Sequence, residues 1–519
     1  MTAGPQDSEP GRRREMMRRD DSATAAANER HRDEGTVGHR LDCSWARVPA
    51  CSRRRLPPAR LRPPPVDHRP RDSGGARRFF IARYPLPVRS LYAVFLGTFT
   101  LRFSTGLTGG LFLFYIAHLH RDYGGPRTDE TTLAVMVALF YASELVLATP
   151  FGMLSDRIGH RRVMQIGPLF GIIASVVTWA STNLGVIGGT RLLEGASTAA
   201  SIPSILGFIA MATAGDELLR GRAAARFEGA TLAGIGAGAV AAGVLYDGIP
   251  GMWAGLHRDA FLLNAGFYVV SLLIYRYGVR EAPAEADTVS DGQKGWRRYA
   301  AVLTSSHVWL LAPTWIAINA ALGLWASQSL FQLIKERDFR FSDQALMGGF
   351  VGAQVALALG VALVIFFAGL AFWGERFRRY RRTTIIFYGI FGGALSVVGA
   401  GIVNHAASIA PLALAAAILA GAGLFVLAGA TPAALGLLAD MSEAYPSNRG
   451  AIMGLYSVFL AIGQIVGSFL GAEAAKHFGI DGILVATLGL LAVALIPLNR
   501  LRPFEHIVGT AAPARRATG

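Results

Sequence analysis

Cysteine is nearly absent from this sequence. The 519 residues contain two, Cys43 and Cys51, both in a polar N-terminal stretch and without metal-ligand spacing. This excludes a disulfide framework. The sequence also lacks a phosphate-binding P-loop, an H-E-x-x-H metal motif and a recognisable Ser, His and Asp nucleophile setting. We therefore expect no enzyme activity, no metal ion, no cofactor and no ATP drive.

Charged residues are few and unevenly distributed. They make up 16% of the chain, and only three of the 50 basic residues are lysine. Together with abundant alanine and glycine, this usage indicates a GC-rich, bacterial genome. The formal net charge of +15 lies largely in the N-terminal stretch and in short loops. No basic folded domain carries it, so we expect no nucleic-acid partner.

The N-terminal stretch, residues 1–87, is rich in Arg and Pro and poor in large apolar residues. Such a segment cannot bury enough surface to offset its ordering entropy, which predicts a disordered basic tail. It lacks the short apolar core of a signal peptide. Two interpretations stay open: a tail that rests on anionic lipid, or an extension without function, such as a misassigned start.

Long apolar blocks fill the rest of the chain, which is 52% hydrophobic with a mean hydropathy of +0.38. A helix needs about 20 apolar residues to cross the hydrocarbon core, and lipid leaves no water for unpaired backbone groups. The sequence therefore predicts an all-α membrane protein with twelve transmembrane helices in two six-helix bundles. The predicted helices are 90–117, 131–152, 163–182, 184–211, 227–247, 260–278, 308–331, 345–371, 383–402, 409–438, 450–472 and 482–499.

The two bundles are expected at 88–279 and 299–500, with a linker at 280–298 and a C-terminal tail at 501–519. The segment 200–207 resembles 429–436, with Pro, Leu and Gly in matching places. Such a repeat is typical of transporters whose solute site lies between the halves. Arg and Lys concentrate in the alternate loops near 157–162, 220–226, 276–298 and 376–382. By the positive-inside rule, both termini lie in the cytoplasm and the protein in the cytoplasmic membrane.

One loop between the second and third predicted helices carries a family signature. It reads G-M-L-S-D-R-I-G-H-R-R from Gly152 to Arg162. This resembles the cytoplasmic loop of the major facilitator superfamily, G-x-L-[SA]-D-R-x-G-R-[RK], from which only His160 departs clearly. The resemblance implies a secondary transporter that works by alternating access.

The same resemblance implies a conformational latch. Gly152 would let two helices approach closely, and Asp156 would face the N-terminus of the helix that begins near Arg449, where the helix dipole favours an anion. A weaker match to the signature loop occurs in the second half of the chain at Glu375–Arg376. The alternative is a basic loop that only sets orientation. The predicted latch residues are Gly152, Asp156, Arg157, Gly159, Arg161, Arg162, Glu375 and Arg376.

Four charged residues inside predicted spans are functional candidates, because such residues are costly in lipid. Arg102 and Glu144 are expected to form a buried pair, which couples protons, contacts solute or is a fixed structural bridge. Arg191 resembles the family's R-x-x-x-G segment, linked to proton coupling or to a structural network. Glu194 could share its face, although both could instead snorkel to the interface.

Polar and glycine residues in other spans could shape a cavity. The fifth predicted helix carries glycines at 229, 234, 236, 238 and 243, suited to tight helix contact, but lacks the proline of some antiporters. Each polar candidate is equally a helix-packing residue. The predicted cavity-lining residues are Asn264, Asn319, Gln328, Gln354, Tyr456 and Gln464.

The function that these patterns favour is proton-coupled efflux of small organic or amphipathic compounds by a monomeric transporter in the bilayer. One alternative is an importer or uniporter of sugars or organic acids. Another is a membrane receptor or assembly factor that uses the fold without transport. The substrate cannot be read from the pattern.

Overall fold

The structure is a computed structural model. It describes residues 86–213, 217–280, 308–377, 379–406, 408–443 and 449–504, apart from the side chains of 86–89, 156, 217, 218, 220, 221, 308–310, 438–443, 449–456 and 504. All these residues belong to one compact unit, Gly75–Gly519. The predicted tails 1–87 and 501–519 and the linker 280–298 lie almost wholly outside the described residues.

The described chain is helical, and no strand occurs in it, which confirms the all-α prediction. We call the helices up to residue 280 the first half and those from residue 308 the second half. The first half contains α1 (Leu86–Tyr123), α2 (Glu130–Ile158), α3 (His160–Met164), α4 (Ile166–Ala180), α5 (Leu184–Ala212), α6 (Glu217–Asp247), α7 (Ala260–Leu273) and a π-helical turn, Ile274–Gly278. The second half contains α9 (Val308–Leu324), a π-helical turn (Trp325–Ser329), α10 (Leu330–Ile334), α11 (Gly352–Arg376), α12 (Arg382–Ala406), α13 (Ala410–Leu427), α14 (Ala430–Glu443) and α15 (Arg449–Leu501).

Nine stretches of the described residues are long and apolar enough to cross a membrane. One of them, Ser457–Leu501, bends at Gly479 and contains parts of the last two predicted spans. The predicted spans 90–117 and 308–331 fall in α1 and in α9–α10, outside these nine. The fold class is therefore confirmed, while the count of twelve spans stays a prediction.

One predicted boundary is wrong, one predicted helix is interrupted, and one break in a helix falls between the predicted spans 450–472 and 482–499. Residues 345–351 do not begin a helix, because Gly348 and Gly349 adopt left-handed φ values of 76° and 84° before α11 starts at Gly352. The predicted helix 409–438 is broken between α13 and α14, where the indole of Trp373 lies against Gly429. At Gly479 a φ of 61° and ψ of −140° interrupt α15, so the bend needs a residue without a side chain.

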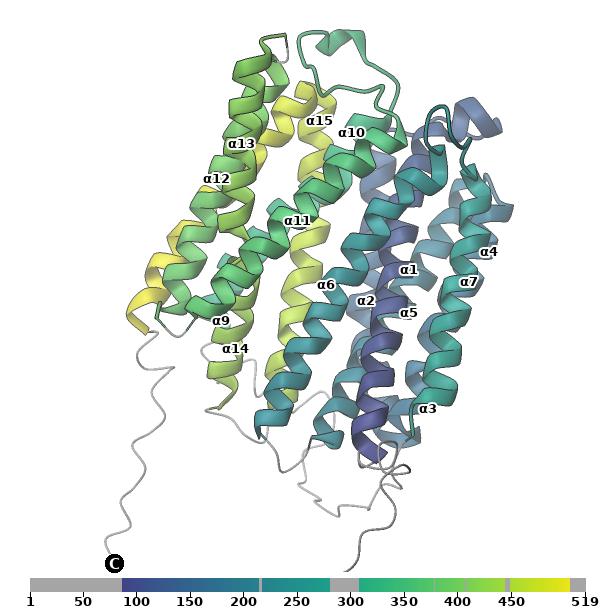
Figure 1. Cartoon of the computed structure of the whole chain (residues 1–519), viewed down its shortest axis with the longest axis vertical. Helices are drawn as coiled ribbons and strands as arrows, with labels where there is room; N and C mark the ends of the chain where they lie inside the picture. The colour runs from purple at the N-terminus through teal and green to yellow at the C-terminus, as the bar shows by residue number, and fades with distance from the viewer. Residues whose placement is uncertain are drawn as a thin grey trace, which may run out of the picture. The chain divides into compact units, whose positions relative to one another are not determined.

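Glycine sets how the first half packs. α1 packs along α6 and α7, whereas α2 packs along α5 (Figure 1). A methyl group at Gly238 of α6 would lie 2.1 Å from the carbonyl oxygen of Phe103 in α1. The same helix turns Gly236 toward Leu363 of α11, where a methyl group would lie 2.3 Å from the side chain. The predicted tight contact of this glycine-rich helix is confirmed on two faces.

The two halves touch through matching helices. α2 of the first half packs on α15, and α6 packs on α11. At the α6–α11 contact, a methyl group at Gly243 would lie 2.3 Å from the carbonyl oxygen of Gly352. We call the end of the bundle that carries α3 the α3 end, and the opposite end, which carries α10, the α10 end (Figure 1). Gly243 and Gly352 lie toward the α10 end, because α6 finishes and α11 begins there.

Candidate functional site

Arg102 lies in α1 and is 8% exposed. Across from it, Gly234 of α6 makes room for the side chain: a methyl group there would lie 2.8 Å from Cβ of Arg102. The Nε atom of Arg102 is buried and has no hydrogen-bond partner within the described residues. A buried donor of this kind is available to water or to a solute.

Two half-buried carboxylates lie within electrostatic reach of Arg102, Glu144 of α2 and Glu228 of α6. Within the described part of the chain, no salt bridge or hydrogen bond joins Arg102 to either acid. The predicted direct Arg102–Glu144 pair is therefore wrong for this conformation.

Helix packing explains the missing pair. A direct contact would require α1 and α2 to pack together, but α1 packs on α6 and α7 while α2 packs on α5 and α15. Gly195 of α5 holds the backbone of α2 at this depth, since a methyl group there would lie 3.1 Å from the amide nitrogen of Glu144. The side chains of Arg102 and Glu144 therefore come from two different packed helix pairs, α1 with α6 and α2 with α5. We call Arg102, Glu144 and Glu228 the charge cluster.

Glu228 was missed by the sequence reasoning, although a signal was present. It lies second in the predicted span 227–247, where the rule that flagged Glu144 gives a weaker signal. In the structure α6 already begins at Glu217, so Glu228 lies inside the helix. Tyr275 also lies within electrostatic reach of Arg102, the arginine of the charge cluster. It comes from the π-helical turn after α7, and its buried hydroxyl has no hydrogen-bond partner in the described chain. Single π-turns are frequent at functional sites.

Arg191 and Glu194 of α5 form a closed ion pair. The guanidinium donates a short hydrogen bond to the carboxylate, and both side chains are buried. Arg191 also lies over the ring of Phe112, 4.4 Å from its centroid, and 5.5 Å from that of Phe140. The expectation that both share one face is confirmed, and snorkelling to the interface is excluded because neither side chain reaches the surface.

The signature loop is shaped by Gly159, whose φ of 98° ends α2 and starts α3. Ser155 closes the turn by donating to the carbonyl of Gly152 at 2.7 Å. His160 is buried beside Gly207 of α5, where a methyl group would lie 2.4 Å from the imidazole ring. Its Nδ1 also lies 3.2 Å from Oγ of Ser155, so the residue that departs from the signature both packs on α5 and makes a polar contact within the loop.

The predicted latch finds little support among the described contacts. Arg161 donates a short hydrogen bond to the carbonyl of Arg276 in its own half, while Arg157 and Arg162 are exposed. A methyl group at Gly152 would lie 3.6 Å from Pro203, an ordinary contact, so no close approach occurs there. The side chains of Asp156 and of the first turns of α15 lie outside the described residues.

The weaker match to the signature at Glu375–Arg376, in the second half, makes no hydrogen bond or salt bridge to the first half among the described side chains. Arg376 donates to the carbonyl of Phe372 in its own helix at 3.0 Å, and its guanidinium lies over that ring. Glu375 is exposed. The latch role of both residues stays a prediction.

The predicted cavity residues divide into packing and interface groups. Asn264 is buried and donates to Ser104 and Thr108 of α1, and Asn319 donates to Trp315 in its own helix. Gln354 is exposed and its Oε1 accepts from the backbone of Val351 at the start of α11, so its role as a lining residue stays a prediction. Gln464 is 8% exposed and packs against Gly323 of α9. The side chain of Tyr456 lies outside the described residues.

Gln328 belongs to a polar contact that joins the two halves at the α10 end. Glu130, the first residue of α2, accepts from Lys335 at 2.7 Å and from Gln332 at 3.0 Å, and its backbone carbonyl accepts from Gln328 at 3.1 Å. Glu130 and Lys335 are 12% and 16% exposed. A second contact places Asp247 2.6 Å from the amide of Gly352. We call these contacts the seam.

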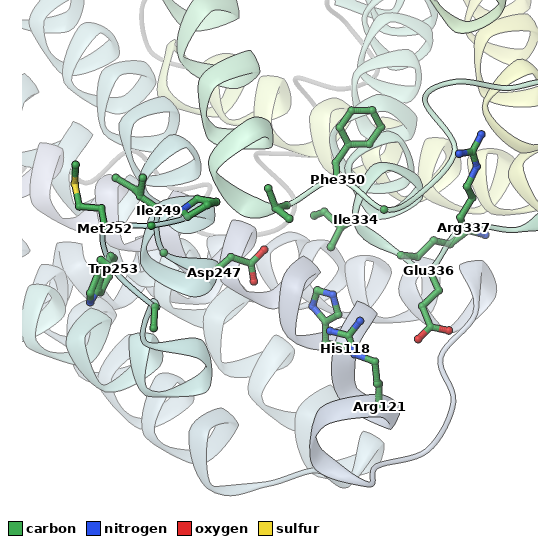
Figure 2. A pocket seen from close by; sticks show the side chains of 17 residues that line it. His118, Arg121, Asp247, Ile249, Met252, Trp253, Ile334, Glu336, Arg337 and Phe350 are labelled. Carbon is green, nitrogen blue, oxygen red and sulfur yellow. The ribbon is translucent and has the colours of Figure 1, made fainter.

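A cavity of about 770 Å³ opens beside the seam (Figure 2). Its walls come from the end of α1, from the turn after α6, and from the segments after α10 and before α11. Figure 2 shows His118 and Arg121 of α1 on one wall and Ile249, Met252 and Trp253 of the turn on another. Both halves therefore line it, at the end of the bundle where they are in contact.

A family model described as the Major Facilitator Superfamily matches residues 94–443, well over half of the chain. The chain belongs to the Major Facilitator Superfamily. The resemblance of the signature loop is thereby confirmed, and the protein is a membrane transporter of this superfamily rather than an enzyme. "Multidrug resistance protein 1" of Bacillus subtilis is 27% identical over 237 residues, which cover 44% of this chain and 57% of that protein. The match thus spans little more than half of that relative.

Solved structures share the superfamily fold. A bacterial homologue of the human lysosomal transporter Spinster, in an inward-facing and unoccupied conformation, aligns with a TM-score of 0.58 at 13% identity. The alignment covers 83% of this chain and all of that one. The nucleoside transporter NupG aligns with a TM-score of 0.56 at 12% identity over 81% of this chain and all of NupG. At such identities the likeness concerns the fold alone.

In this superfamily member, the predicted charged residues fall into two settings. Arg102 and Glu144 meet in the charge cluster, with Glu228 as an additional member. Arg191 and Glu194 form their own pair on α5. Glu130, Lys335 and Asp247 were not singled out from the sequence, because they stand at helix ends, where charged residues are ordinary.

Proposed function

We propose that this protein exports small organic, amphipathic compounds in exchange for protons. The observation that carries the proposal is the charge cluster, one buried arginine with two half-buried carboxylates and no salt bridge among them. The partial likeness to a multidrug resistance protein supports the substrate class and the direction. We further propose that the α3 end faces the cytoplasm of a bacterial cell.

Charge balance indicates how the cluster would handle a proton. Two ionised carboxylates around one guanidinium leave a net negative charge inside the bilayer, where an uncompensated charge is strongly disfavoured. Binding of one proton makes the cluster neutral. A cationic solute can replace that proton, because it neutralises the same charge. Proton and solute would then compete for one site, which is the requirement for exchange.

The seam supports an alternating-access cycle. The halves touch at the α10 end through polar contacts, chiefly Glu130 with Lys335 and Asp247 with Gly352. Beside them Phe331, Ile334 and Val355 of the second half pack into the apolar core of the first half, so opening this end must separate apolar packing as well as the polar contacts. We propose that they close the outer side in this conformation and break when the cluster is presented to the outside.

Everted membrane vesicles test the exchange, with the amphipathic cations ethidium and rhodamine 6G as probes. An acidic lumen should drive accumulation of the probe by the wild type. Glu144→Gln and Glu228→Gln should each abolish the response to the pH gradient while allowing probe movement down its own gradient. The matched control is Glu473→Gln, because Glu473 is exposed and, within the described residues, pairs with His477 alone at 2.8 Å.

Two outcomes would overturn the proposal. One is probe flux through the wild type that is the same with and without the pH gradient. The other is full gradient-driven accumulation in the double variant Glu144→Gln, Glu228→Gln. Loss of accumulation in the Glu473→Gln control would show that removal of any carboxylate impairs the protein, and would equally remove the support.

A further inference from the structure

Three potential metal ligands converge at the α10 end of the second half, away from the charge cluster. Asp343 lies between α10 and α11, His405 ends α12, and Asp481 follows the bend of α15. The imidazole Nε2 lies 2.9 Å from Oδ2 of Asp481, and Nδ1 lies 3.9 Å from Oδ2 of Asp343. One ligand atom from each residue lies within 4.8 Å of the others.

The backbone around this group is fixed by buried amides. Asn404 donates to Asp481 at 2.9 Å, and its own oxygen accepts from the amide of Leu346 at 3.0 Å. Gln344 accepts from the amides of Ile480 and Asp481 at 2.8 and 3.4 Å. Both amide side chains are almost fully buried. Three separate segments are thus held together before any ligand arrives, which lowers the entropy cost of binding.

The donor set has the chemistry of a transition-metal site. An imidazole nitrogen with two carboxylate oxygens suits Zn²⁺ and its neighbours, whereas Mg²⁺ and Ca²⁺ prefer oxygen ligands alone. The nitrogen ligand distinguishes this group from an ordinary acidic patch. Three protein ligands also leave positions for water, so the site would be open rather than closed.

We propose that Asp343, His405 and Asp481 bind a divalent transition-metal ion, with Zn²⁺ preferred over Mn²⁺ and Mg²⁺. The ion replaces the contact between Nε2 of His405 and Asp481, takes the lone pair of that nitrogen and one oxygen from Asp481, and releases any proton on the nitrogen to solvent. Asp343, whose side chain is 70% exposed, turns from the Nδ1 side to supply the third ligand. Bound metal clamps the segment before α11 to the ends of α12 and α15. It therefore stabilises the outer rim of the second half and does not require transport.

Calorimetric titration and thermal unfolding of the full chain in detergent test the site, after removal of any affinity tag and treatment with EDTA. Zn²⁺ should bind with a stoichiometry near one and raise the unfolding temperature, and Mg²⁺ should do neither. Asp343→Asn is the sharpest variant, because this side chain is 70% exposed and its loss should leave the apo stability unchanged. We expect about tenfold weaker Zn²⁺ binding or more, as for loss of groups that support a metal.

His405→Gln should also abolish the Zn²⁺ response. The matched control is His477→Gln, because His477 lies near the same end and contacts one carboxylate, Glu473, at 2.8 Å; its Zn²⁺ affinity should equal that of the wild type. The proposal is overturned if the wild type binds Zn²⁺ no more tightly than Asp343→Asn. It is also overturned if only His477→Gln weakens binding, or if Mg²⁺ matches Zn²⁺.

Discussion

Two arginine–glutamate groups lie inside the first half, and they differ in how their charges are arranged. Arg191 and Glu194 stand three residues apart on one helix, in direct contact and against the ring of Phe112. The charge cluster draws Arg102, Glu144 and Glu228 from three helices, without a salt bridge among them. Both groups have a buried arginine, but the carboxylates of the charge cluster are only half-buried, and only the Arg191 pair satisfies its charges internally.

This difference separates a structural role from a transport role. A closed pair on one helix moves as a unit and stays neutral through any tilt of the halves. Groups on separate helices change their separation when those helices move. A charged group without a salt-bridge partner can then bind a proton or a charged solute instead. We infer that pairing geometry, more than burial, decides which intramembrane charge is available for coupling.

The largest effect is expected from breaking the closed pair. Glu194→Gln leaves Arg191 buried without a counter-charge, which should lower the free energy of unfolding by about 3–5 kcal/mol. Thermal unfolding of detergent-purified protein measures the loss. Glu144→Gln should lower stability much less, because Glu144 has no salt bridge to lose.

A double variant checks the cause. Replacing both Arg191 and Glu194 by leucine should recover most of the stability, since apolar substitution of a buried pair is often neutral. If Glu194→Gln were as stable as the wild type, or if Glu144→Gln were the less stable of the two, the contrast between the groups would be lost.

The next effect concerns the fit of α6 against Arg102. Gly234→Ala would place a methyl group 2.7 Å from the carbonyl of Phe99 and 2.8 Å from Cβ of Arg102. We expect a loss of about 1–3 kcal/mol from overpacking and reduced gradient-driven transport. Gly229→Ala on the same helix is the control, because nothing lies within 4 Å of a methyl group there. It should be neutral or stabilising by up to about 1 kcal/mol, and equal effects of both variants would argue against a role for close packing at Arg102.

Much of this architecture could be predicted from the sequence, and the failures have physical causes. Apolar block length locates the helices because the bilayer sets it, and the signature loop identifies the superfamily. The sequence does not show which helices are neighbours, because the order of helices along the chain does not determine which of them pack together. For this reason the prediction of a direct Arg102–Glu144 pair failed. The seam was missed because Glu130 and Lys335 are ordinary helix-end charges until both halves are assembled.

The seam should show a smaller effect than the closed pair. Lys335→Met removes the contact to Glu130, which is part-exposed and also bound by Gln332. We expect a shift of about tenfold toward a conformation open at the α10 end, which corresponds to about 1.4 kcal/mol. Spin-label distances across the seam, after replacement of Cys43 and Cys51, measure the shift. Unchanged distances would mean that the apolar packing of α2 on α15 and of α6 on α11 closes this end alone.

The smallest effect is expected from an exposed carboxylate outside the spans. Asp129 caps α2, and hydrogen bonds from the hydroxyl and backbone amide of Thr132 lower its pKa. Because the folded pKa is below the unfolded value of about 3.9, the cap stabilises the protein above that value. Its contribution is lost as the pH falls through the folded pKa. Asp129→Ala should therefore lower stability by about 1 kcal/mol at pH 7 and by less at about pH 3. Thermal unfolding at both pH values measures this difference, and a constant loss would show that Asp129 acts through packing and not through its charge.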